Sequence, residues 1–169
     1  PEGYGKDTIT EAIAEFEKTL ITPNSRFDQF LLGKSDALTP EEKEGYALFK
    51  KYRCATCHVG KAMGGQSFEK MGLKADYFKD RGGKITEADL GRYNVTKNEE
   101  DKHKFKVPLL RNIALTPPYL HDGSTEDLQK VVNIMLKYQV GIQIPKSEEE
   151  KIVKFLHTLT GEYNGKLLQ

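Results

Sequence analysis

One short run of the chain, Cys54-Ala55-Thr56-Cys57-His58, carries its most specific chemistry. The sequence contains 2 cysteines, both in this run, and a histidine directly follows the second. Two thiols separated by two residues can add to the two vinyl groups of a porphyrin as thioethers, and the histidine then offers its imidazole to the iron. The pattern therefore predicts one covalently bound haem c, with Cys54 and Cys57 as the thioether residues and His58 as an axial ligand.

Other uses of such a cysteine pair fit less well. A zinc site needs two further Cys or His ligands at matched spacing, and the other histidines are scattered along the chain. A thioredoxin-like redox pair follows a strand in an alternating βαβ context, whereas a helix is expected before Cys54. A disulfide between residues so close in a helix has poor geometry. Haem attachment remains the preferred interpretation.

The second axial ligand of the iron must come from a distant histidine or methionine. The candidates are His103, His121, His157, Met63, Met71 and Met135. Met63 and Met71 are too near His58 in sequence to reach the opposite haem face without a tight loop. His157 is expected at the protein surface, and His103 within a solvated cluster of lysines. Residue type and spacing leave His121 and Met135 as near-equal alternatives.

The elements expected to position these residues are helices. Helical start signals or apolar spacings cover residues 8–20, residues 39 into the cysteines, residues 124–138 and residues 147–159. The start at Thr39-Pro40-Glu41-Glu42 is the clearest, since it combines an N-cap, a first-turn proline and a capping box. Glycine-rich residues 60–91 are expected to form a loop with short helical turns at 75–79 and 86–90. No alternating strand pattern is visible, so the expected fold class is all-α.

Gly45 lies in the middle of the helix that leads into the cysteines. Glycine there costs roughly 1 kcal/mol relative to alanine, which a close approach by another helix would explain. The expected partner is the last helix, with Phe155 and Leu159 on its apolar side. A crossing of first and last helices is the frame of the small cytochrome c domain. The alternative is an ordinary amphipathic helix that tolerates a glycine.

Composition excludes several protein classes. The chain has 169 residues with 26 Lys+Arg against 25 Asp+Glu, a net charge of +1 that removes the case for a general nucleic-acid binder. Its apolar stretches are too short to span a membrane. The chain begins at Pro1 and has no apolar leader, which is expected of a mature or trimmed product.

An internal repeat concerns the organisation of the chain. Residues 11–20 align without gaps with residues 150–159, and Glu, Ile, Phe, Thr and Leu match. Either two amphipathic helices share a core pattern, or each helix closes the same kind of module. In the second interpretation the module that Leu20 closes is absent, because 19 residues precede Leu20.

Several runs together resemble the second-haem domain of the bacterial di-haem cytochrome c peroxidases. They are residues 105–123 (FKVPLLRNIALTPPYLHDG), Phe27-Asp28, Leu48-Phe49, Gly64-Gly65 and Leu90-Gly91-Arg92-Tyr93. The resemblance covers essentially the whole chain. It implies a parent enzyme with two cytochrome c-like domains, in which a first, peroxidatic haem reduces hydrogen peroxide to water. The second haem, with a His/Met ligand pair, takes electrons from a small soluble donor.

The resemblance also implies roles for single residues. Cys54, Cys57 and His58 match the thioether and proximal residues, and Met135 falls at the axial methionine. His121 matches a histidine that lies near a haem propionate. Related enzymes that modify a protein substrate have tyrosine at the methionine position, so Met135 argues against that branch.

Two further roles concern a propionate and a cation. Arg111 is expected to pair with a haem propionate, since a buried propionate favours a guanidinium partner. The family also binds calcium between its domains, and backbone carbonyls matching Thr116 and Pro118 are among the ligands. The asparagine ligand from the first domain is absent here, so the calcium site is incomplete.

The expected organisation is a class I cytochrome c-like domain with an additional N-terminal helix. Residues 1–22 match the terminal helix of a missing N-terminal haem domain, 23–38 a linker, 39–160 the cytochrome c domain and 161–169 a tail. Because the chain lacks a second Cys-x-x-Cys-His, it lacks the peroxidatic haem. The expected function is electron transfer to that haem, while catalysis of peroxide reduction belongs to the parent protein.

The expected partners are a small electron donor (a cytochrome c or a cupredoxin) and the missing peroxidatic domain, with a homodimer as an additional option. Covalent haem attachment of this kind is completed outside the cytoplasm, and the family is periplasmic, so the expected localisation is the periplasm. The alternative function is a self-standing monohaem electron carrier. Burial of the apolar side of residues 8–20 would favour the carrier, and its exposure would favour a piece of a larger protein.

Overall fold

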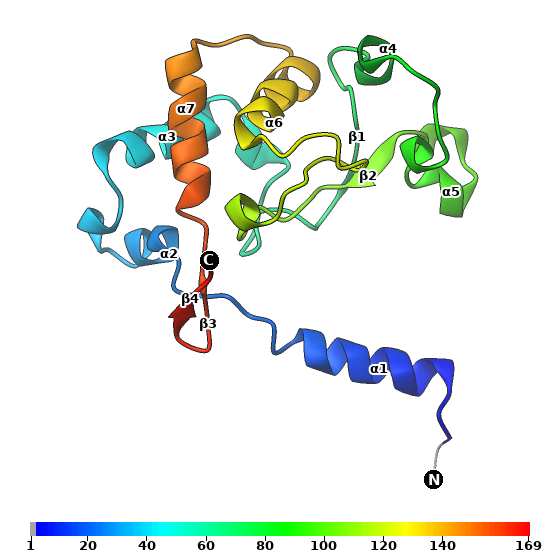
Figure 1. Cartoon of the computed structure of the whole chain (residues 1–169), viewed down its shortest axis with the longest axis horizontal. Coiled ribbons are helices and arrows are strands. Elements are labelled where there is room, and N and C mark those ends of the chain that lie inside the picture. The colour runs from blue at the N-terminus through cyan, green and yellow to red at the C-terminus, as the bar shows by residue number, and fades with distance from the viewer. Residues whose placement is uncertain (1–2) are drawn as a thin grey trace.

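The computed structural model describes residues 3–169, and helices are the main elements (Figure 1). The α-helices are α1 (Lys6–Glu17), α2 (Arg26–Leu31), α3 (Pro40–Lys51), α4 (Tyr77–Arg81), α5 (Tyr93–Thr96), α6 (Leu128–Met135) and α7 (Lys146–His157). Short 3-10 turns are η1 (Ser35–Ala37), η2 (Cys54–Thr56), η3 (Ala88–Leu90), η4 (Glu99–Asp101) and η5 (Ile113–Leu115). A π-helical turn, η6 (Leu136–Val140), directly follows α6.

Two small antiparallel sheets supplement the helices. Strand β1 (Phe68–Lys70) pairs with β2 (Lys104–Lys106), with Glu69 opposite Phe105. Strand β3 (Glu162–Tyr163) pairs with β4 (Lys166–Leu167). The expected all-α class is therefore only partly right, because the fold is helix-rich with these strands added. Strands of two or three residues are too short to show the alternation by which a sequence reveals a strand.

The core is built on the crossing of α3 and α7. A Cβ at Gly45 would lie 1.9 Å from the carbonyl oxygen of Lys151 and 3.0 Å from the Cβ of Phe155. Phe155 is fully buried, and its ring centroid lies 5.3 Å from that of Phe49. The structure confirms the last helix as the partner that approaches Gly45.

The start of α3 is as expected. The Thr39 side chain accepts a hydrogen bond from the Glu42 N–H, and the Glu42 carboxylate accepts one from the Thr39 N–H at 2.7 Å. Arg26 also donates to Glu42, at 2.8 Å. Burial opposes ionisation of Glu42, but these hydrogen bonds hold its pKa below the usual range. Glu42 thus completes the capping box of α3 and, through Arg26, also joins α3 to α2.

The expected boundaries of the other helices need correction. The N-cap of α1 is Gly5, and Thr8 occupies the third helical position, where its hydroxyl accepts from the Gly5 N–H. No side chain caps α7, which begins directly after Pro145. Helix α6 begins later than residue 124, because the Asp127 carboxylate caps it by accepting from the N–H groups of residues 129 and 130. Polar residues near a helix start offer several caps, and the three-dimensional path selects one.

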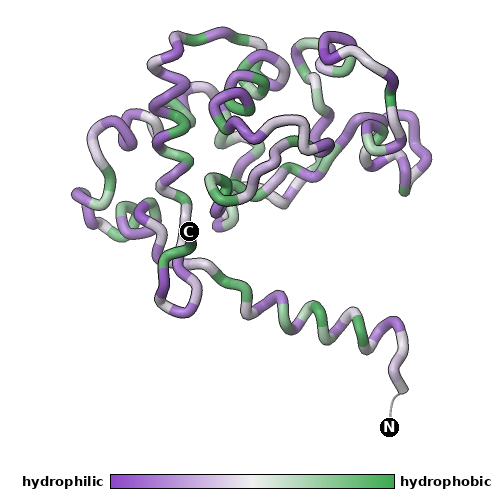
Figure 2. Tube along the Cα trace, viewed as in Figure 1, coloured by the Kyte–Doolittle hydropathy of each residue, from purple (hydrophilic) through white to green (hydrophobic). Residues whose placement is uncertain are grey.

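Helix α1 extends away from the remaining elements toward the N-terminus (Figure 1). Its apolar residues are visible as green segments along the tube in Figure 2. Ile9, Ile13, Phe16 and Leu20 are each 50–60% exposed, and no residue of α1 is buried. The apolar face of α1 therefore lies in solvent.

Over residues 3–169, no helix has both the length and the apolar character that a membrane crossing requires.

Candidate haem site

The Cys-x-x-Cys-His run lies directly after α3. Arg53 adopts a left-handed conformation (φ 61°) that ends the helix and redirects the chain. Cys54 then begins the turn η2. The Cys54 carbonyl oxygen accepts hydrogen bonds from the N–H of Cys57 at 3.3 Å and from the N–H of His58 at 3.1 Å. Both cysteines are free thiols and partly exposed. The thiols and the imidazole are therefore presented by one compact turn.

The His58 ring is oriented by the loop that follows it. Its Nδ1 lies 3.3 Å from the carbonyl oxygen of Met63, and the Pro108 carbonyl also faces the ring. A carbonyl oxygen can only accept, so the Met63 contact assigns a proton to Nδ1, and in the neutral ring the lone pair is on Nε2. Burial lowers the pKa of His58 and so favours the neutral imidazole. A neutral imidazole with a free nitrogen is the form that binds a metal.

The loop after His58 is held by a second segment of the chain. The Gly65 N–H donates to the Val107 carbonyl at 2.8 Å, and the Leu110 N–H donates to the Met63 carbonyl at 3.2 Å. A Cβ at Gly64 would lie 2.1 Å from the Pro108 carbonyl oxygen, so glycine is required for this approach. The Met63 carbonyl is thereby fixed beside the His58 ring, while its side chain packs in the core.

Met135 is the last residue of α6, at the point where the α-helix changes to the π-turn η6. Its side chain is partly buried, whereas the following Leu136 is almost completely buried in the core. Met71 lies after β1 and lines a surface hollow of about 490 Å³ together with Phe78 and His103. π-Turns within helices occur frequently at functional sites.

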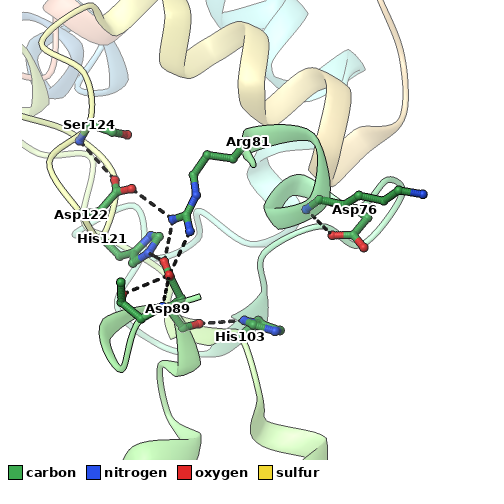
Figure 3. Close-up of polar contacts among 9 residues, drawn as sticks. Asp76, Arg81, Asp89, His103, His121, Asp122 and Ser124 are labelled. Atoms are coloured by element: carbon green, nitrogen blue, oxygen red, sulfur yellow. Dashed lines mark hydrogen bonds and ion pairs between the residues drawn. The ribbon is translucent and has the colours of Figure 1, made fainter. Parts of the chain in front are cut away.

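The sequence alone left His121 and Met135 unresolved, and the position of His121 bears on that choice (Figure 3). The His121 Nε2 lies 2.7 Å from a carboxylate oxygen of Asp89, which is 1% exposed. The His121 ring centroid also lies 4.6 Å from that of Phe105. Because Asp89 engages Nε2, that nitrogen is not free for iron in this structure.

Asp89 is the centre of a polar network that the motif analysis missed. Arg81 donates to both carboxylate oxygens, at 2.6 and 2.9 Å, and the Thr86 N–H donates at 2.7 Å. His103 Nδ1 lies 2.7 Å from the Asp89 backbone carbonyl. The hydrogen bond from Arg81, with those from Thr86 and His121, holds the pKa of Asp89 well below its usual range. Arg81 and Asp89 lie in the glycine-rich stretch, where no periodic pattern marks them.

Arg111 has a carboxylate partner other than the propionate expected from the sequence. Its Nη2 donates to Asp28 at 2.6 Å, its Nη1 to the Ser25 hydroxyl at 2.9 Å, and its Nε to the Lys61 carbonyl at 2.9 Å. All three kinds of guanidinium nitrogen therefore donate to the protein itself. Two of these acceptors, Ser25 and Asp28, form the capping box of α2, and the pairing of Arg111 with a propionate stays a prediction.

Thr116 and Pro118 lie in an exposed stretch between η5 and Tyr119. The Pro117–Pro118 peptide bond is cis, and the Tyr119 hydroxyl donates to the Ile113 carbonyl at 2.9 Å. The two residues are near each other in the chain with their backbone close to the surface. The calcium assignment stays a prediction.

The donor set fits a c-type haem. Two free thiols share one turn, a neutral imidazole presents Nε2, and Met135 offers a thioether. These are the groups that thioether attachment and haem-iron ligation require. Within residues 3–169, no cluster of three or more His, Cys, Asp or Glu side chains could hold a separate metal ion, so the zinc interpretation gains no support there.

A helix crossing that carries a Cys-x-x-Cys-His turn at the end of its first helix is typical of a c-type cytochrome. Comparison with known proteins shows which of them this chain resembles. A family model described as di-haem cytochrome c peroxidase matches residues 2–36. Cytochrome c peroxidase Ccp of Escherichia coli is 55% identical over 163 residues, which are 96% of this chain and 34% of that protein. Cytochrome c551 peroxidase of Nitrosomonas europaea is 50% identical over 92% of this chain and 45% of its own length.

A solved structure shares the fold. The crystal structure of a MauG-like protein associated with microbial copper homeostasis has a TM-score of 0.71 and 30% identity, covering 82% of this chain and 49% of that one. The family model and these relatives show that the chain is similar to part of the di-haem cytochrome c peroxidases, and the solved structure shows that it shares a fold with part of a MauG-like protein. The chain spans between a third and a half of these proteins, with shares of 34%, 45% and 49%.

Proposed function

We propose that this chain is the electron-transferring c-type haem portion of a di-haem cytochrome c peroxidase. It accepts electrons from a small redox donor and passes them to a peroxidatic haem that lies outside this chain. The observation that carries the proposal is the Cys54–His58 turn, on which two free thiols accompany an imidazole oriented by the Met63 carbonyl. The peroxidase relatives support the electron destination.

We assign the two axial positions of the iron to His58 and Met135. A bound haem c supplies one-electron exchange between Fe(III) and Fe(II). The Met63 carbonyl holds the proton on Nδ1 of His58, which keeps Nε2 available as a ligand. A thioether ligand completes the coordination and favours electron transfer over direct binding of peroxide. The fold is proposed to be of class I cytochrome c type, with α3 and α7 as the crossed helices.

Helix α1 supports a division of the chain into parts. Its apolar residues are exposed, although an amphipathic helix gains stability mainly by burying that face. The family model matches residues 2–36, a stretch that ends before the Cys-x-x-Cys-His run. We propose that residues 1–22 complete a preceding haem domain, that 23–38 are a linker, that 39–160 form the cytochrome c domain and that 161–169 are a tail. The exposure disfavours the self-standing carrier.

Three further proposals follow from the family. A calcium ion would take the backbone carbonyls of Thr116 and Pro118 together with water and ligands from the preceding domain. The donor would be a small cytochrome c or cupredoxin. The protein would function in the periplasm, where this type of haem attachment is completed.

Deleting residues 1–20 tests the division and the function together. We expect the shortened, haem-loaded protein to keep the midpoint of denaturant unfolding of the full chain, because the deleted side chains are exposed. We also expect both proteins to cycle between Fe(III) and Fe(II) with little peroxidase turnover. Robust peroxide reduction by a preparation with one haem per chain and Met135 still bound would contradict the electron-transfer role.

A further inference from the structure

The side chain of Gln139 joins two segments that are distant in the sequence. Its Oε1 accepts hydrogen bonds from the N–H of Gly72 at 2.7 Å and of Leu73 at 3.2 Å. Its Nε2 donates to the carbonyl oxygen of Lys70 at 3.0 Å. One amide therefore satisfies three backbone groups, one at Lys70, where β1 ends, and two at Gly72 and Leu73 in the loop that follows. This arrangement needs both the donor and the acceptor of an amide side chain.

Backbone and packing contacts continue the same junction. The Lys74 N–H donates to the Tyr138 carbonyl at 2.9 Å, and a Cβ at Gly141 would lie 2.9 Å from the Lys74 Cβ. The Tyr138 hydroxyl donates to Asp80 at 3.0 Å, and its ring packs against Tyr77 with centroids 5.2 Å apart. The π-turn η6 is thus docked on residues 70–80.

The docked turn begins directly after Met135. Leu136, the first residue of η6, is 2% exposed, so one side of the turn is anchored in the core. Gln139 anchors the other side to the loop. A π-turn departs from regular α-helical hydrogen bonding, and such departures persist where surrounding contacts maintain them. The direction in which the Met135 side chain leaves α6 therefore depends on both anchors.

We propose that Gln139 is a positioning residue that holds the Met135 thioether at the haem iron. The proposal rests on the proposed function, in which Met135 is the sixth ligand. Gln139 acts through the backbone of the turn and makes no contact with iron itself. Without the three hydrogen bonds, η6 would populate arrangements in which the thioether is withdrawn. A competing small ligand would then bind iron more readily, since the bound-methionine state would lose population.

The test uses the haem-loaded ferric protein and imidazole as the competing ligand. The readouts are the near-infrared band of methionine–iron ligation and the imidazole concentration that removes half of it. We expect Gln139→Ala to lower that concentration about tenfold, the effect of losing hydrogen bonds of ordinary strength. Gln139→Glu retains the acceptors for Gly72 and Leu73 but loses the donor to Lys70, so its value should lie between those of Gln139→Ala and the wild type.

Gln129→Ala is the matched control, because Gln129 lies on α6, directly before the turn η6, and its amide donates to Glu149 at 3.1 Å. It should behave as the wild type does. Equal imidazole affinity in Gln139→Ala and the wild type, or an equal loss in Gln129→Ala and Gln139→Ala, would overturn the role of Gln139. If Met135→Ala retains the methionine band, the assignment of Met135 itself fails, and the role of Gln139 fails with it. If the band is lost in Met135→Ala while the imidazole concentration that removes half of it is unchanged in Gln139→Ala, only the role of Gln139 is rejected.

Discussion

The carbonyl oxygen of Lys151 occupies the space that a side chain at Gly45 would need. A Cβ built on Gly45 would lie 1.9 Å from that oxygen and 2.6 Å from its carbon. These atoms are backbone of α7 and cannot move aside as the end of a flexible side chain could. The distance between α3 and α7 therefore depends on the absence of a side chain at residue 45. The same crossing positions the end of α3, from which the cysteine turn begins.

Gly45→Ala should destabilise the protein. Alanine in mid-helix is favoured over glycine by roughly 1 kcal/mol, whereas forcing the helices apart typically costs about 1–3 kcal/mol and occasionally more. A backbone clash this close belongs at the upper end of that range, so we expect a net loss of about 2 kcal/mol, measured by denaturant unfolding of the haem-loaded protein.

Gly3→Ala is the control for that substitution, because no atom lies within 4 Å of the position of its Cβ. It should leave the unfolding midpoint unchanged. A stabilised Gly45→Ala protein would show that α3 and α7 are not in this close contact.

Met135→His should lower the reduction potential and abolish the methionine–iron band, since histidine favours the ferric state relative to methionine. Substituting Met63 or Met71 by leucine should leave both properties in place. Met63 contributes its carbonyl to His58, and this group survives the substitution. Loss of the band in a Met63 or Met71 variant, with the band retained in Met135→His, would transfer the ligand assignment.

Asp89 should make the protein sensitive to acid. Its hydrogen bond from Arg81, with others, depresses its pKa in the folded state, so the folded form binds this proton less readily than the unfolded form. The resulting stability is fully present above the ordinary aspartate pKa of about 3.9 and is lost as the pH falls below it. Asp89→Asn should flatten the fall in stability over this acidic range.

At neutral pH, Asp89→Asn should cost about 2 kcal/mol, less than the 3–5 kcal/mol typical of a broken buried pair, because Arg81 retains some solvent exposure. Asp7→Asn on exposed α1 is the control. An Asp89→Asn protein with wild-type stability both at neutral pH and in the acidic range would contradict the role of the Asp89 network.

Arg111→Ala should reduce stability without changing the haem redox titration. Arg111 and Asp28 form a partly buried pair at 2.6 Å. A double-mutant cycle with Asp28→Ala should give a coupling of about 1–2 kcal/mol. A coupling near zero together with a shifted reduction potential would instead favour the propionate pairing that the sequence indicated.

Features set by neighbouring residues were more predictable from the sequence than contacts between distant residues. Local signals were sufficient for α3, where Thr39, Pro40 and Glu42 satisfy the requirements of a helix start within four residues. Gly45 also identified its partner helix, because glycine in mid-helix needs a steric reason. The Cys54–His58 run defines its own chemistry through a fixed spacing.

Long-range polar pairs were not predictable in this way. Arg111 was recognised as a residue in need of an anion, but Asp28 lies 83 residues away in the sequence. The partnership of His121 with Asp89 spans 32 residues and depends on how the glycine-rich loop folds back. The π-turn after Met135 follows from docking against residues 70–74, and the apolar spacing of residues 131–138 resembles that of a continuous helix.

The haem content of the chain tests the central claim most directly. The chain should be produced in a host that carries out c-type haem attachment, and its intact mass and pyridine haemochrome spectrum measured under denaturing conditions. The account predicts one haem per chain that stays attached on denaturation, and none in a Cys54→Ala, Cys57→Ala double variant. A wild-type chain with the mass of the bare polypeptide, or with a haem released on denaturation, would contradict it.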